Sequence, residues 1–107
     1  MKLKINLDFG IDRTVQKDAI SDREIFRNYL QYVVQSGYKN SLKSDQRRIW
    51  DNILNKLEEG ISNSQDEIEL NAIQIVFLKD AFKEATCAPQ DAKAVTLVEE
   101  AINQAEQ

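Results

Sequence analysis

The feature that most constrains the fold is a change in apolar spacing within residues 66–86, DEIELNAIQIVFLKDAFKEAT. Ile68 and Leu70 alternate with charged residues, as in a strand with one buried face, and the apolar residues after them recur at helical spacing. Asn71, between the two patterns, is a typical helix N-cap. This stretch therefore predicts a short strand that runs directly into a helix. Residues 73–78 also alternate in part, so their period alone leaves open whether they form helix or strand.

A second strand is predicted at the start of the chain. Residues 1–9 alternate strictly, and Leu3, Ile5 and Leu7 share one face. The opposite face carries lysines, and the strand at residues 67–70 carries glutamates on its polar face. Pairing the two strands would set opposite charges across from each other, which stabilises a sheet by about 0.2–1 kcal/mol per pair.

Two helices are expected between the strands, after a loop at residues 10–19 that has no sustained period. The first begins at Asp22, because Ser21 and Glu24 form a capping-box pattern. Gly37 is in the right place to end it as a left-handed residue, with Tyr38 packing back on the helix. The second is expected to begin after an N-cap at Ser44 and to stop at Gly60, and its buried stripe has five members: Ile49, Trp50, Ile53, Leu54 and Leu57.

A final helix is expected after Pro89, a residue that suits the first turn of a helix. It would form a helical hairpin with the helix that follows Asn71. The chain is therefore predicted to be a single α+β domain over residues 1–107, with a short two-stranded sheet in β-α-α-β-α-α order packed with four helices.

The residue types argue against catalysis. The chain contains no histidine, so it has no Ser-His-Asp or Cys-His pair and no histidine general base. The paired glutamates fall on faces predicted to be exposed. Each of the three glycines is already assigned to a turn or a helix end, so none is left to form a glycine-rich phosphate-binding loop. We expect no enzymatic activity, no cofactor, no metal and no small-molecule substrate.

The apolar runs are too short to cross a membrane, which needs about 20 residues, and the alternating start of the chain does not resemble a signal peptide. A cytoplasmic location without membrane association is therefore expected.

Charge is divided unevenly along the chain. Residues 1–50 contain ten Lys and Arg against six Asp and Glu, and residues 51–107 contain four against twelve. This division indicates either that the two halves face each other or that the basic half meets a polyanion.

The function favoured by these patterns is that of a small protein-interaction or assembly module. A two-stranded sheet is marginal alone, and its edge must be covered or paired. Self-association through the edge strand, with Leu3, Ile5 and Leu7 as the interaction residues, would complete it. Accessory proteins of phages and mobile elements include small acidic modules of this kind.

The alternative is a nucleic-acid-binding regulator. Lys39, Lys43, Arg47 and Arg48 surround the start of the second helix, a layout similar in outline to a helix-turn-helix. The connection between the helices is longer than the 3–4 residues of that motif. A sequence pI near 4.8 also opposes non-specific attraction to phosphate.

Overall fold

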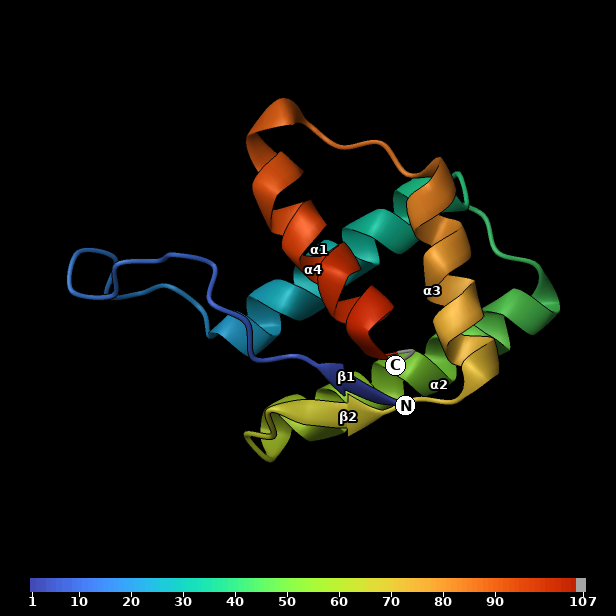
Figure 1. Cartoon of the computed structure of the whole chain (residues 1–107), viewed down its shortest axis with the longest axis horizontal. Helices are drawn as coiled ribbons and strands as arrows, with labels where there is room; N and C mark the ends of the chain where they lie inside the picture. Colours follow the sequence, from blue (N-terminus) through green and yellow to red (C-terminus); the bar gives the residue numbers. More distant parts are fainter. Residues whose placement is uncertain (106–107) are drawn as a thin grey trace.

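The structure, a computed structural model, describes residues 1–105 and has the predicted α+β architecture (Figure 1). The elements, in chain order, are β1 (Lys2–Lys4), α1 (Asp22–Gly37), α2 (Ser44–Ser62), β2 (Glu67–Glu69), α3 (Ala72–Glu84), the 3-10 turn η1 (Pro89–Asp91) and α4 (Ala92–Ala105). α3 and α4 run antiparallel and pack on each other, as the predicted hairpin requires. α1 packs against both of them, β1 lies against α4, and β2 lies against α2.

The sheet has the predicted charge pairing. β1 and β2 are antiparallel, with Lys2 opposite Glu69 and Lys4 opposite Glu67 on the solvent face. Lys2 Nζ also lies 3.8 Å from the Glu67 carboxylate. Leu3 and Ile68 are paired on the other face, which is buried in the core.

β1 is much shorter than the predicted strand of residues 1–9. Ladder pairing ends where the Ile5 N–H donates to the Asp66 carbonyl at 2.9 Å, because β2 has only three residues. Leu7 and Phe9 still pack against the core without a strand partner. The alternation in the sequence was thus correct for burial and wrong for strand length.

The change of period is confirmed, and residues 73–78 are helical. The Asn71 side chain accepts from the Gln74 N–H at 2.8 Å, and the Gln74 side chain accepts from the Asn71 N–H at 2.9 Å. Two otherwise unpaired donors of the first turn are thereby satisfied. This reciprocal cap fixes the point at which the strand gives way to α3.

Replacing the cap residue tests this account. Asn71→Ala is expected to lower the free energy of unfolding by about 1 kcal/mol, because it leaves the Gln74 N–H without its acceptor. Urea denaturation followed by circular dichroism measures the loss. A change below a few tenths of a kcal/mol would show that water replaces the cap at no cost.

Two glycines have roles different from those predicted. Gly37 is the last residue of α1 and is not left-handed; the positive φ angles fall on Lys39 (54°) and Asn40 (63°). A Cβ on Gly37 would lie 2.7 Å from the Ala81 carbonyl carbon, so this glycine lets α1 approach the backbone of α3. Gly60 does not stop α2, which continues to Ser62.

The α2 cap is also shifted by one residue from the prediction. Ser44 is the first helical residue, and Lys43 is the N-cap. The Lys43 N–H donates to the Gln46 side chain at 2.9 Å. The N-cap of α2 is therefore a lysine that is exposed at the surface.

Candidate interaction surfaces

The predicted edge-strand residues lie inside the protein. Leu3 and Ile5 are completely buried and Leu7 is half-buried. Their side chains belong to the core, so a partner strand would meet only the backbone of β1. Because Met1 and Ile5 bond to the opposite strand, alternation turns the N–H and C=O groups of Lys2 and Lys4 away from β2.

The outer edge of β1 carries two lysines, Lys2 and Lys4. A symmetric dimer formed by pairing two β1 edges would set Lys2 and Lys4 of one copy beside the same lysines of the other. Like charges directly opposite each other destabilise a sheet, and lysine on an edge strand is a common way of preventing edge pairing. The edge therefore has backbone N–H and C=O groups free for pairing, but its lysines would repel those of a second copy.

The four predicted nucleic-acid-binding residues come together at the α1–α2 corner. Lys39 lies in the connection, Lys43 caps α2, and Arg47 and Arg48 lie in its first turns. All four are exposed, and none has an ion pair within 4.0 Å to another residue in the described part of the chain. We call these four residues the basic corner.

Several cations outside the basic corner form ion pairs within the described residues. Among residues 1–105, ion pairs are formed by the Met1 amino group and by the side chains of Lys2, Arg13, Arg23, Arg27 and Lys83. The basic corner differs because four cations without such a pair lie close together. Asp45 and Asp51 lie on α2 among these cations and reduce that charge without cancelling it.

A groove of about 530 Å³ adjoins the basic corner. Its lining includes Gln31, Gln35, Tyr38, Asn40, Arg47 and Trp50. The amides come from α1 and the connection, and the indole comes from α2. The sequence placed Trp50 in a core stripe, and the structure leaves it half-buried, packed on Phe77 and lining the groove.

Phe77 packs against the two aromatic rings that line the groove, those of Tyr38 and Trp50. The Tyr38 ring stacks on Phe77 with centroids 4.7 Å apart, and Trp50 stacks on it at 6.2 Å. The Tyr38 hydroxyl donates to the Phe77 carbonyl at 2.7 Å. Burial, with a smaller contribution from the charge of Asp80, raises the pKa of Tyr38 to about 12.

This shift predicts how stability depends on alkaline pH. The fold favours the neutral phenol, so the stability contributed by Tyr38 is complete below pH 10 and is lost as pH rises through about 12. An alkaline titration of phenolate absorbance should show one tyrosine ionising after the other two, and Tyr38→Phe should remove that last phase. If the phase persists in Tyr38→Phe, the late group is another tyrosine.

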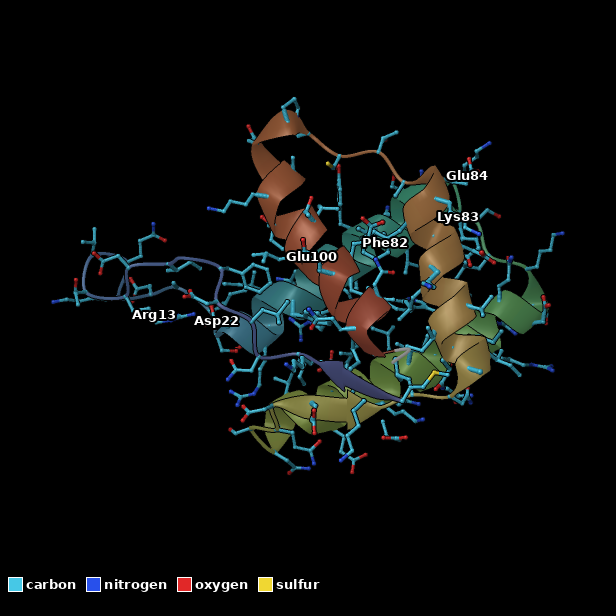
Figure 2. All side chains as sticks on the ribbon, viewed as in Figure 1. Arg13, Asp22, Phe82, Lys83, Glu84 and Glu100 are labelled. Carbon is cyan, nitrogen blue, oxygen red and sulfur yellow. The ribbon has the colours of Figure 1, made fainter. Side chains whose placement is uncertain are left out.

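A second surface lies at the opposite end of α1, where residues 10–20 project from the body as an arm (Figure 1). Arg13 ties the arm together: its guanidinium donates to the carbonyls of Ala19 and Ile20 at 3.1 and 2.8 Å. It also pairs with Asp22 at 3.1 Å, at the start of α1 (Figure 2). The sequence predicted a loop here but gave no sign of this ordering.

The arm begins with a turn whose side chains bond to its own backbone. Asp12 accepts from the N–H and hydroxyl of Thr14. These two bonds, the hydroxyl first, lower the pKa of the Asp12 carboxyl. At the tip, Val15 is 77% exposed. The arm thus presents an aliphatic side chain to solvent from a folded turn.

A hollow of about 380 Å³ lies at the base of the arm. It is lined by Ile11, Ile25, Asn28, Tyr29, Tyr32 and Asp91, and we call it the α1 hollow. Tyr32 is 40% exposed there. The Tyr29 hydroxyl donates to Asp91 at 3.3 Å, and burial and then this carboxylate raise the pKa of Tyr29.

Within residues 1–105, no group of three or more His, Cys, Asp or Glu side chains is arranged to hold a metal ion. No helix in the same part of the chain is both long and apolar enough to cross a membrane.

Comparison of the chain with protein-family models, with curated proteins and with solved structures gave no match. A function for this chain must therefore be inferred from its own geometry.

Proposed function

We propose that this protein is a non-enzymatic interaction module that self-associates through the arm and the α1 hollow. The observation that carries the proposal is the exposure of apolar side chains at this end of α1. Val15 and Ile20 of the arm are 77% and 43% exposed, and Tyr32, which lines the α1 hollow, is 40% exposed. Tyrosine is enriched at protein interfaces, and exposed apolar side chains can be buried against a partner.

The two features complement each other on one chain. The arm carries an aliphatic tip, and the α1 hollow is a concave site with aliphatic and aromatic walls. In a two-fold dimer each copy can place its tip in the hollow of the other, because an isologous interface uses the same surface patch on both subunits. Fully burying one valine side chain contributes about 1.5–3 kcal/mol.

The fixed conformation of the arm supports a role in self-association. Arg13 already fixes the conformation of the arm in the single chain through its bonds to two carbonyls and Asp22. A segment that is ordered before binding loses less conformational entropy when it meets a partner. The β1 edge carries lysines that disfavour pairing with a second copy of itself, so the arm is the better candidate for the contact.

Light scattering on chromatographed protein tests the proposal. The wild-type chain should have the mass of two copies at hundreds of micromolar, with little change at high salt because the contact is apolar. Val15→Asp and Tyr32→Asp should lower the association constant by at least about 100-fold, since burying an unpaired carboxylate costs several kcal/mol. Thr96→Asp, an exposed change on α4, is the matched control and should remain dimeric.

A proline in β1 distinguishes the arm from the edge strand. Lys4→Pro removes an outward N–H and leaves the Ile5 bond to Asp66 in place, and proline is tolerated on an edge strand in this orientation. If Lys4→Pro gives a monomer and Val15→Asp does not, the interface is the strand edge. A wild-type monomer at every concentration would contradict self-association altogether.

A further inference from the structure

We infer that the basic corner and its groove form a binding site for single-stranded nucleic acid, with bases entering the groove beside Trp50 and phosphates held by the surrounding cations. This site lies at the other end of α1 from the arm, so the inference goes beyond self-association and does not depend on it.

The first support is the available positive charge. Lys39, Lys43, Arg47 and Arg48 are exposed and form no ion pair within the described residues, in contrast to Arg23 and Arg27 on α1. Cations that are not neutralised by the chain can replace the counterions of a phosphate backbone. The acidic remainder of the molecule would repel a polyanion and so direct it to this corner.

The second support is the chemistry of the groove. Gln31, Gln35 and Asn40 contribute three side-chain amides, and the structure gives these amides no hydrogen-bond partner within residues 1–105. Amides can donate to and accept from the edges of bases. The Arg47 guanidinium, which also lines the groove, can bind a phosphate or lie flat on a base.

The third support is the aromatic wall. Trp50 and Tyr38 both line the groove, and both are held from behind by Phe77. A planar ring at the wall of a positively charged groove is the usual platform on which single-stranded bases stack. An acidic peptide would satisfy the cations, but its carboxylate side chains have no aromatic face to stack on the rings.

A single strand fits this corner better than a duplex. Bases can stack on protein rings only when they are released from the duplex stack. A helix-turn-helix would require a short turn to set its second helix in the major groove. Here, residues 38–43 separate α1 from α2, and two of them have positive φ angles. The connection is therefore longer than the turn of a helix-turn-helix, and the cations border a groove instead of lying on a recognition helix.

Tryptophan fluorescence provides a direct test, because Trp50 is the single tryptophan of the chain. An oligothymidylate of about 15 nucleotides should quench the emission saturably at low salt, because bases stack on aromatic rings. The logarithm of the association constant should fall with the logarithm of salt concentration with a slope of about −2 to −3, for three or four phosphate contacts on a single strand. Anisotropy of a labelled strand measures binding independently of stacking.

Variants and competitors separate this site from general charge attraction. The double variant Arg47→Glu, Arg48→Glu should weaken strand binding at least tenfold, whereas Lys17→Glu and Lys93→Glu, exposed cations on the arm and on α4, should leave it within twofold. A duplex of the same sequence and a polyglutamate peptide should bind at least tenfold more weakly and should not quench Trp50.

Four results would overturn the inference. They are the absence of anisotropy change at low salt, anisotropy change without quenching, equal binding of duplex or polyglutamate, and equal losses in the control variants. None of them bears on the mass of the protein, so the site and the proposed self-association stand or fall separately.

Discussion

Gly37→Ala is expected to lower the free energy of unfolding by about 2–3 kcal/mol. In an exposed helix, alanine at this position would be favourable by up to about 1 kcal/mol. Here the added Cβ would lie 2.7 Å from both the carbonyl carbon and the Cα of Ala81. These are backbone atoms of α3, so the clash can be relieved only by moving one helix away from the other.

Gly60→Ala is the control, because it places a methyl group against movable side-chain atoms and not against backbone. Its Cβ would lie 2.7 Å from Ile68 Cγ2 and 3.1 Å from Ile5 Cδ1, which are the ends of side chains. Rotation of these groups should limit the loss to about 1 kcal/mol. Urea denaturation followed by circular dichroism measures both variants. If Gly37→Ala is neutral or stabilising, α1 and α3 do not approach as closely as the structure indicates.

Local patterns in the sequence predicted much of the fold correctly. The cap formed by Asn71, the cap of α1 at Ser21 and the opposition of Lys2 to Glu69 all depend on residues whose effect is confined to a turn or to a strand pair. The fold class followed from them. Apolar period also predicted burial well, since Phe26, Leu30 and Val33 are buried in α1 as their spacing required.

What the sequence could not predict depends on contacts between distant segments. A glycine near a helix end is equally consistent with a left-handed cap and with a close approach, and only the crossing of α1 with α3 decides for Gly37. The length of β1 likewise depends on how many residues β2 offers for pairing. Neither kind of information is contained in the period of one segment.

The candidate sites show the same limit. The basic corner was visible as four cations close together in the sequence, but the amides of its groove lie on α1 and carried no signal. Trp50 fitted a core stripe, and for a fully buried ring Trp50→Ala would cost about 3–5 kcal/mol. Since the indole is half-buried, we expect a loss nearer 2 kcal/mol, measured by urea denaturation.

Phe77→Ala should be the most damaging single change in the aromatic cluster, with a loss of about 3–5 kcal/mol in the free energy of unfolding. Phe77 is 5% exposed and is stacked by Tyr38 and by Trp50. Truncation would leave a cavity between α2 and α3 and remove the support of both rings. Urea denaturation measures the loss, and a value below about 1.5 kcal/mol would show that the two rings close over the cavity.

Phe77→Leu tests the stacking of Phe77 on Trp50 without unfolding the protein. Leucine keeps most of the buried apolar volume, so the fold should survive with a loss of about 1–1.5 kcal/mol, but it has no ring on which Trp50 can stack. The emission of Trp50 should shift, and oligothymidylate affinity should fall several-fold although Phe77 does not line the groove. Dimer mass should not change, because Phe77 belongs neither to the arm nor to the lining of the α1 hollow. If strand affinity is unchanged while the emission shifts, bases do not rest on the indole, and the cations alone hold the strand.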